Sequence, residues 1–356
     1  MYLLHLAAYA AGCRRRRSGS PPVSVERARP ISWVVPPSSL HNACRPLLKW
    51  AGGKRQLLPV IREYYPSGFS RYFEPFLGSG AVFFDMAGSG RLDGRPAVLS
   101  DCNQDLIGCY EAVRDNPEAV AGELMELADR HAACADFYYE VRDRRFNPAR
   151  AAGASPRTPE LAAMLIYLNR TGFNGLFRVN RRGAFNVPAG RYANPRICDP
   201  ARITQVSRLL RAPGVSLEVA AFDAQLDRAQ AGDFIYCDPP YAPLSPTASF
   251  AQYTAGGFGD SDQLRLQRSL LAASQRGALI VLSNSSAPLI LGLFASREAA
   301  DAGLMLRRVP ARRAINSRAT SRGPVDEVLV TSRALGLSHV VPPRPVSVPV
   351  RIRTRA

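Results

Sequence analysis

Short apolar runs alternate with stretches of helical periodicity between about residues 46 and 332, and this alternation constrains the fold more than any other feature. The runs typical of strands are RYFEPF (71–76), PAVLSD (96–101), VSLEVA (215–220), GDFIYCD (232–238), GALIVLSN (277–284), LMLRRV (304–309) and VDEVLVT (325–331). Strands that alternate with helices form a mostly parallel sheet covered on both faces, so the pattern predicts an α/β fold. Such sheets bind ligands beyond the carboxyl ends of their strands.

Residues 115–212 interrupt this alternation. Helical periodicity occurs there at 117–130, 134–145, 159–170 and 199–211, with little strand signal. Residues 171–196 are instead rich in Gly, Asn, Arg and aromatic residues and have no apolar period. We interpret 115–212 as an inserted, mainly helical recognition domain, with 46–114 and 213–332 forming the domain that holds the sheet.

The 46 Lys and Arg residues exceed the 29 Asp and Glu residues, and the formal net charge of +17 makes a polyanion the first partner to consider. The Pro- and Arg-rich ends, residues 1–45 and 333–356, supply +6 and +5 of that charge. Their composition predicts disordered tails that add non-specific nucleic-acid affinity at most. A start codon assigned too far upstream would explain residues 1–45 equally well.

Neither a membrane nor the secretory pathway is indicated. The apolar start precedes Arg14 to Arg17, the reverse of the order in a secretory signal, and no apolar run reaches about 18 residues. The seven Cys form no CxxC pair and the four His lie far apart, which predicts a reduced protein without a metal site. We expect a cytoplasmic, nucleoid-associated protein that acts as a monomer.

The string FLGSG (76–80) follows a predicted strand and opens a predicted helix. Its glycines let the backbone approach a ligand, and the helix start offers free N–H groups, although a plain strand–helix connection has the same pattern. Asp101 ends the next strand 23 residues after Gly78, the spacing at which a carboxylate meets ribose hydroxyls in nucleotide folds. The pair predicts a cofactor that contains a nucleoside.

The string KWAGGK (49–54) holds the two lysines of the chain around a glycine pair. Trp50 is suited to stack on a purine or to contact a sulfonium, and Lys54 to hold a carboxylate. A Trp that only packs, beside two surface lysines, is the alternative. The Walker pattern G-x-x-x-x-G-K-[ST] is absent, which disfavours ATP hydrolysis.

The string CDPPY (237–241) ends an apolar strand with a carboxylate, a stiff proline pair and an aromatic ring. The prolines leave the carbonyl that precedes Pro240 without a neighbouring N–H, while Asp238 offers acceptor oxygens and Tyr241 a stacking face. Such groups can grip an amino group in the plane of a heterocycle and keep the lone pair of its nitrogen directed at an electrophile.

These strings, with Asp101–Cys102–Asn103, LNRTGFNGLFRVNRRGAFNVPAGRY (168–192) and CDPPYAPLS (237–245), resemble the Dam-type DNA adenine-N6 methyltransferases, D12 class, alpha group. The resemblance runs from about Leu47 to Ser332. It implies a Rossmann-like class I methyltransferase sheet with the recognition domain inserted between the cofactor loop and DPPY. It also implies S-adenosylmethionine as methyl donor and double-stranded DNA, usually with the sequence GATC, as substrate. A restriction-modification role and a solitary role in DNA replication both stay open.

The resemblance carries over to individual positions of this sequence. Positions that contact the cofactor are Trp50, Lys54, Asp101 and Asp238. The catalytic motif is Asp238, Pro239, Pro240 and Tyr241. Positions that enter or flank the DNA are Lys49, Phe173, Asn174, Leu176, Arg178, Pro188, Arg191 and Tyr192.

Two departures from the family pattern stand out. Phe173 occupies a position where Tyr is usual, which keeps an aromatic wedge but drops a hydroxyl. In residues 314–327, Arg318, Arg322 and Pro324 replace a Gly-rich, Lys-containing loop, which bears on phosphate contacts more than on chemistry. Two other functions stay open: methylation of RNA or of a small amine on the same fold, and DNA binding without catalysis.

Overall fold

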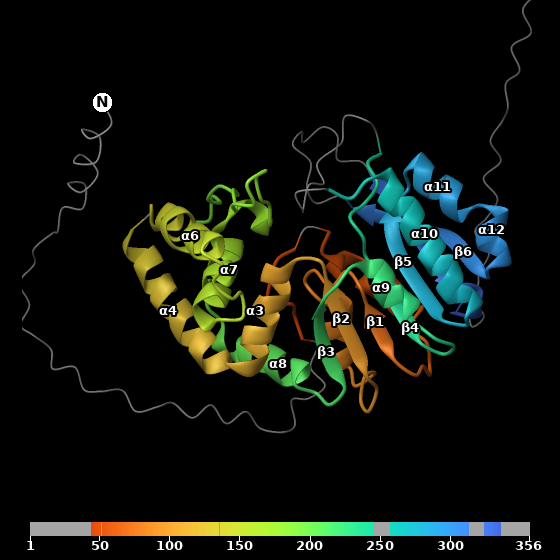
Figure 1. Ribbon diagram of the computed structural model, residues 1–356, viewed down its shortest axis with the longest axis horizontal. Coiled ribbons are helices and arrows are strands. Elements are labelled where there is room, and N and C mark those ends of the chain that lie inside the picture. Colours follow the sequence, from red (N-terminus) through yellow and green to blue (C-terminus); the bar gives the residue numbers. More distant parts are fainter. Residues whose placement is uncertain (1–43, 51, 135, 245–256, 313–323, 336–356) are drawn as a thin grey trace, which may run out of the picture. The chain divides into compact units, whose positions relative to one another are not determined.

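The seven predicted strands form one sheet in the order β3-β2-β1-β4-β5-β7-β6 (Figure 1). Their bounds are β1 Tyr72–Glu74, β2 Ala97–Asp101, β3 Val215–Val219, β4 Phe234–Cys237, β5 Leu279–Ser285, β6 Leu304–Arg312 and β7 Pro324–Ser332. In the middle of the sheet, Phe73 lies opposite Val98 and Ile235 in parallel register. Two strands on one side of β1 and four on the other leave its carboxyl end at the centre of the sheet edge.

The computed structural model describes residues 44–50, 52–134, 136–244, 257–312 and 324–335. All of them belong to one unit, residues 40–356. Arg318, Arg322 and nearly all of the two predicted tails lie outside the described residues. None of the helices in the described ranges is long and apolar enough to cross a membrane.

Strand direction changes near one end of the sheet. Strands β1 to β5 run parallel, whereas β7 runs antiparallel between β5 and β6. Leu329 of β7 therefore pairs with Ser283 on one side and with Arg307 on the other. The prediction of a mostly parallel sheet is correct for five strands, and the last two strands of the chain depart from it.

The pleat of the sheet divides the apolar core into two clusters. Along β1, Tyr72 packs in the first cluster and Phe73 in the second; along β4, Phe234 and Ile235 alternate in the same way. Helices α2 (Ala81–Gly88) and α3 (Gln104–Asp115) contribute to the first cluster. The second cluster includes residues of α9 (Phe222–Asp227), α10 (Asp260–Gln275), α11 (Pro288–Phe294) and α12 (Arg297–Asp301).

Helix starts follow local capping chemistry. Asn103 directly after β2 accepts the N–H groups of Asp105 and Leu106 at 3.0 and 3.2 Å, which starts α3 at the sheet edge. Thr158 and Asp199 cap α7 (Pro159–Thr171) and α8 (Pro200–Leu210) with side-chain oxygens, each of which accepts one N–H, whereas the longer helix α4 (Pro117–Ala133) has no side-chain cap. The remaining bounds are α1 Leu58–Arg62, α5 Phe137–Tyr139 and α6 Asn147–Ala151, with short 3-10 turns η2 Lys54–Gln56, η4 Phe173–Gly175 and η7 Arg333–Leu335.

The helix predicted over 134–145 differs in type. Only Phe137–Tyr139 is α-helical, and Glu140–Phe146 (η3) forms a π-helix. Tyr138 Oη and Arg142 Nη1 both donate to the carbonyl of Val187 at 2.9 Å, so this segment is held by the loop it packs against. Apolar periodicity in the sequence distinguishes a helix from a strand but not an α-helix from a π-helix, so it could not predict these contacts.

Helices α4, α7 and α8 of the 115–212 region pack with α3, and Figure 1 shows α4, α6 and α7 beyond α3, away from the strands. An ion pair joins Arg150 of α6 to Asp105 of α3 at 2.7 Å. One core cluster continues from the sheet into these helices. The separate inserted domain therefore stays a prediction.

Candidate active site

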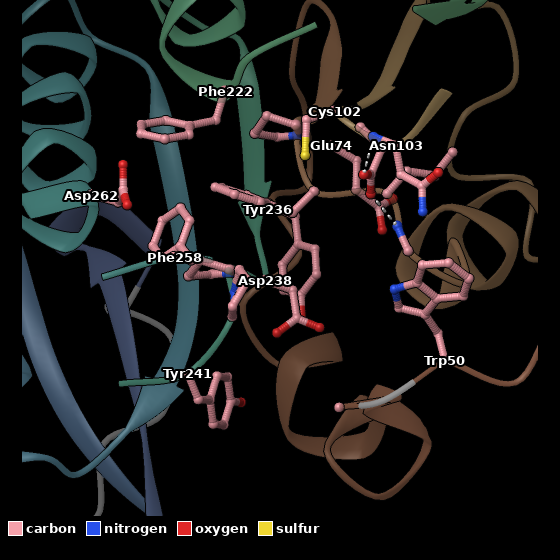
Figure 2. Close-up of a pocket in the computed structure, with 18 of the residues that line it drawn as sticks. Trp50, Glu74, Cys102, Asn103, Phe222, Tyr236, Asp238, Tyr241, Phe258 and Asp262 are labelled. Atoms are coloured by element: carbon pink, nitrogen blue, oxygen red, sulfur yellow. Dashed lines mark hydrogen bonds between the residues drawn. The ribbon is translucent and has the colours of Figure 1, made fainter. Parts of the chain in front are cut away.

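A cavity of about 600 Å³ lies at the carboxyl ends of β1, β2 and β4, where the α/β pattern predicts a ligand (Figure 2). Its walls come from the segments after successive strands, residues 75–79, 101–103, 220–222 and 238–244, and from Trp50 and its neighbours. Cavities of about 300–1,000 Å³ bind ligands of nucleoside size and above. Residues far apart in the chain thus share one ligand-sized space.

The glycine turn after β1 is locked to the end of β2. The Gly78 N–H donates to Asp101 Oδ2 at 3.1 Å, and the Asn103 N–H donates to Oδ1 at 3.0 Å. Gly78 has a φ of +48°, and a Cβ there would lie 2.9 Å from Trp50 Cδ1, so glycine is required. Burial raises the pKa of Asp101, and these N–H donors oppose the rise. The predicted cofactor residues Asp101 and Trp50 are therefore brought together.

Trp50 stacks on Phe177, with ring centroids 5.7 Å apart and an interplanar angle of 21°. The indole also lines the cavity (Figure 2). Part of Trp50 is thus committed to an aromatic partner from the 171–196 segment. Its contact with a purine or a sulfonium stays a prediction.

Lys54 lies inside the site and is only 4% exposed. Its Nζ lies 2.6 Å from Asp238 Oδ1, donates to the Gly52 carbonyl at 2.7 Å, and sits 4.4 Å from the centroid of the Tyr241 ring. Burial raises the pKa of Asp238, and the Lys54 ammonium and the Ser283 hydroxyl oppose the rise. Lys54 is therefore the counter-ion of Asp238, and its predicted bond to a cofactor carboxylate stays a prediction.

The DPPY turn is held by side chains of α10 and β5. Gln263 Nε2 donates to the Pro240 carbonyl at 2.9 Å, and Asn284 Oδ1 accepts the Ala242 N–H at 3.2 Å. Ser283 Oγ donates to Asp238 Oδ1 at 3.1 Å. In Figure 2 the Asp238 carboxylate lies between the Tyr241 ring and Trp50. The turn thus presents a carboxylate and an aromatic ring to the cavity in a fixed backbone.

Tyr241 has a partner that the sequence analysis does not single out. Its hydroxyl donates to Glu327 Oε2 on β7 at 2.6 Å. The acidic pair Asp326 and Glu327 near the start of a predicted strand was the only sequence signal for Glu327, and it suggests no partner by itself.

Glu74 is a second residue that the sequence analysis missed. It ends β1 at the cavity, is 2% exposed, and accepts the Tyr72 hydroxyl at 2.7 Å and the Phe83 N–H at 3.0 Å. Burial raises its pKa to about 8. A carboxyl group at the end of a fully buried strand was the available signal.

An aromatic group forms another wall of the cavity. The ring centroid of Phe76 lies 5.3 Å from that of Phe222 and 5.8 Å from that of Phe258. The Arg265 guanidinium lies 4.9 Å from the Phe222 centroid. Figure 2 shows Phe222 and Phe258 on the opposite side of Tyr236 from Trp50. These rings offer an apolar surface for a flat heterocycle.

The predicted DNA-side residues lie mainly on one segment, residues 173–192. Those with exposed side chains are Phe173, Asn174, Arg178, Pro188, Arg191 and Tyr192, and Leu176 is half-buried. Between them, Phe177, Phe185 and Val187 are buried and fasten the segment to the helices. Outward polar and aromatic side chains on an anchored loop are suited to binding, and their contact with DNA stays a prediction.

Arg178 is already oriented on this surface. Its Nε donates to Asn186 Oδ1 at 2.8 Å, and its carbonyl accepts the Asn186 N–H at 3.0 Å. Val179 and Phe185 form an isolated antiparallel bridge beside it. Asn174 has a φ of +54°, the only positive φ among the described residues other than glycine, in the 3-10 turn at the tip.

Asn169 fastens this segment to the KWAGGK loop. Its Oδ1 accepts the Lys49 N–H at 2.8 Å, and its Nδ2 donates to the carbonyls of Lys49 and Gly175 at 2.7 and 2.9 Å. Lys49 Nζ lies 4.4 Å from the centroid of the Tyr192 ring. The loop that lines the cavity and the exposed segment are therefore one connected structure.

Comparison with known proteins agrees with this geometry. The family model for the D12 class N6 adenine-specific DNA methyltransferase matches residues 50–306. The chain is 38% identical over 294 residues to the type II methyltransferase M1.LlaDCHI of Lactococcus lactis subsp. cremoris, covering 81% of this chain and 95% of that protein. It is 37% identical over 288 residues to the type II methyltransferase M.MjaIII of Methanocaldococcus jannaschii, covering 78% and 95%. It is 34% identical over 285 residues to the DNA adenine methylase of Escherichia coli K12, covering 80% and 94%.

A seven-stranded α/β sheet with a glycine turn, a carboxylate at the second strand end and DPPY in one cavity defines a class I DNA methyltransferase that acts on adenine. The chain belongs to the D12 class of N6 adenine-specific DNA methyltransferases. Enzymes of this class use S-adenosylmethionine, and the cavity fits it: Asp101 suits ribose hydroxyls, Gly78 permits close backbone approach, and the aromatic wall suits adenine. The fold and activity implied by the resemblance are thus confirmed at this level.

Proposed function

We propose that this enzyme methylates the N6 amino group of an adenine flipped out of double-stranded DNA, within the sequence GATC. The observation that carries the proposal is the Asp238 carboxylate beside the Tyr241 ring, in the cavity that also holds Gly78 and Asp101. All predicted DNA-side residues except Lys49 lie on the exposed segment 173–192. Asn169 joins this segment to Lys49, next to Trp50 in the cavity wall.

The chain's own residues bind and orient the reacting amino group. Asp238 and the Pro239 carbonyl accept its two hydrogens, and the Tyr241 ring stacks on the base. Both N–H bonds then lie in the plane of the acceptors, so the nitrogen lone pair is left for the incoming electrophile. S-adenosylmethionine, held by Trp50 and Asp101, supplies a methyl group on a sulfonium. Positioning supplies most of the rate enhancement, and no metal is needed.

Target choice rests on the exposed segment. Arg178 is suited to a guanine edge, and Leu176 and Pro188 to thymine methyl groups; each good bidentate pair discriminates by about 1–3 kcal/mol. Lys49, Asn174, Arg191 and Tyr192 complete the contact surface. The adenine flips out because its amino group cannot meet a methyl donor inside the base stack. Phe173 then fills the space that the adenine leaves.

The experiment follows tritium from labelled S-adenosylmethionine into two duplexes that differ only in GATC and GTTC, with nucleoside analysis of the product. We expect N6-methyladenine in the GATC duplex alone, and we expect Asp238→Ala to abolish transfer while duplex binding survives. Label in both duplexes would keep the chemistry and reject GATC. Label in neither would favour an RNA substrate or a non-catalytic binder. Sedimentation of the same samples tests the proposed monomer.

A further inference from the structure

We propose that Glu327 is a positioning residue that holds the Tyr241 ring in the orientation in which it stacks on the target base. This inference rests on the proposed function, in which Tyr241 is the stacking ring. Glu327 acts through the Tyr241 hydroxyl and contacts neither the base nor the methyl donor.

The first support is the contact itself. The Tyr241 hydroxyl donates to Glu327 Oε2 at 2.6 Å, and neither side chain is fully exposed. Hydrogen bonds to a charged acceptor are about twice as strong as neutral ones. Burial and the carboxylates of Asp238 and Glu327 raise the pKa of Tyr241 well above its usual value, so the hydroxyl keeps its proton and remains a donor.

The second support is the place of Tyr241 in the DPPY turn, where a fixed backbone does not by itself fix the orientation of the ring. The residue follows two prolines in a turn outside any helix or strand, so the backbone hydrogen bonds of an element do not restrict its ring. The Lys54 ammonium lies 4.4 Å from the ring centroid and occupies one ring face. A contact at the far tip of the ring restricts rotation about the Cα–Cβ bond, and the Glu327 carboxylate supplies one beside the Ser283 hydroxyl.

The third support is the rigidity of the anchor. Glu327 lies in β7 and pairs with Ser285 of β5 on one side and Val309 of β6 on the other. A side chain on a strand paired on both sides places its oxygens more reproducibly than one on a loop. Because β7 lies antiparallel beside β5, the Glu327 carboxylate is held next to the Tyr241 hydroxyl of the DPPY turn.

A double-mutant cycle tests the proposal with Glu327→Ala, Tyr241→Phe and the combination. We expect each single variant to lower kcat about tenfold with an unchanged KM for the methyl donor, as for loss of one hydrogen bond to a charged group. In the Tyr241→Phe background, Glu327→Ala should cost nothing further. Glu327→Gln, which keeps an acceptor but loses the charge, should restore most of kcat.

A second readout follows the base directly. With 2-aminopurine at the target position, the fluorescence lifetime component of the stacked base should shrink in Glu327→Ala and persist in Glu327→Gln. The matched control is Asp326→Ala, the neighbouring exposed residue of β7, which pairs with Arg308 at 3.7 Å and should leave both readouts unchanged. Thermal unfolding of every variant shows whether the fold is retained.

Two results would overturn the proposal. If Glu327→Ala lowered kcat by a further tenfold in the Tyr241→Phe background, Glu327 would act by a route that does not involve the Tyr241 hydroxyl. Equal losses in Glu327→Gln and Glu327→Ala would show that its charge near Asp238 matters instead of the hydrogen bond. Retained activity of Asp238→Ala would refute the proposed function separately, whatever the cycle gives.

Discussion

The ammonium of Lys54 and the carboxylate of Asp238 lie 2.6 Å apart, although 184 positions separate the two residues in the sequence. Lys54 is almost fully buried, and removal of one partner of a buried pair leaves an uncompensated charge. The same ammonium lies against the ring of Tyr241. One lysine therefore contacts both the carboxylate and the ring of the DPPY turn.

Lys54→Met should move the acid limb of the kcat–pH profile to higher pH. The Asp238 carboxylate must be ionised to accept amino hydrogens, so activity falls as pH falls through its pKa. Burial raises that pKa and Lys54 opposes the rise, so loss of the ammonium raises it further. Profiles of methyl transfer for the wild type and the variant measure the shift. Lys49→Met removes an exposed ammonium and should leave the acid limb in place; superimposable profiles for Lys54→Met would refute the pairing.

Glu74→Gln should flatten the pH dependence of stability. Burial raises the pKa of Glu74 to about 8 in the folded protein, whereas the unfolded chain loses this proton near the ordinary pKa of 4.5. The contribution of Glu74 to the free energy of unfolding is therefore fully present below pH 4.5 and is lost as pH rises through about 8. Denaturant unfolding across this range should show a falling free energy of unfolding in the wild type and a smaller fall in the variant.

The matched control for this measurement is Glu118→Gln, on the exposed first turn of α4, which should retain the wild-type slope. A slope in Glu74→Gln equal to that of the wild type would show that Glu74 ionises normally when folded.

Asn169→Ala should weaken cofactor binding and target discrimination together. The change leaves the carbonyls of Lys49 and Gly175 without their donor, at a cost of about 1–3 kcal/mol for each buried group. The Lys49–Trp50 segment is then free to shift, so we expect a lower melting temperature and a weaker change of tryptophan fluorescence on addition of S-adenosylmethionine.

Asn147 offers a control of the same chemistry. It accepts the Phe185 N–H at 2.8 Å and donates to the Phe185 carbonyl at 2.9 Å, but it does not contact the KWAGGK loop. Asn147→Ala should impair discrimination and leave cofactor binding intact. Equal cofactor affinity in both variants would argue that Asn169 is only a packing residue.

Arg178→Ala should relax sequence choice while cofactor binding survives. The guanidinium is exposed and held by Asn186, so its removal deletes a base contact without opening the core. We expect the ratio of kcat/KM between a GATC duplex and one with an altered guanine to fall by about one to two orders of magnitude, the worth of one bidentate pair. Arg181→Ala, an exposed neighbour, is the control; an unchanged ratio in Arg178→Ala would remove Arg178 from recognition.

Periodicity was sufficient to predict the strands and most of the long helices. Apolar runs such as 232–238 and amphipathic stretches such as 159–170 are local patterns, and the structure places β4 and α7 there within a few residues. The sequence analysis did not predict the short helices α1, α6, α9, α11 and α12, which are too short to show a clear apolar period. Nor did it predict the π-helix Glu140–Phe146, because its geometry depends on contacts with Val187.

The element order, the motifs and the family can be read from the sequence, because each depends on residues that are close together in the chain. Three contacts are visible only in the folded protein: Lys54 pairs with Asp238, Tyr241 donates to Glu327, and Trp50 stacks on Phe177. The first two contacts depend on which strands are neighbours in the sheet, and the third depends on Asn169, which joins the segment of Lys49 to that of Gly175. Strand order, including the antiparallel β7 beside β5, follows from the packing of the whole core and has no local signature.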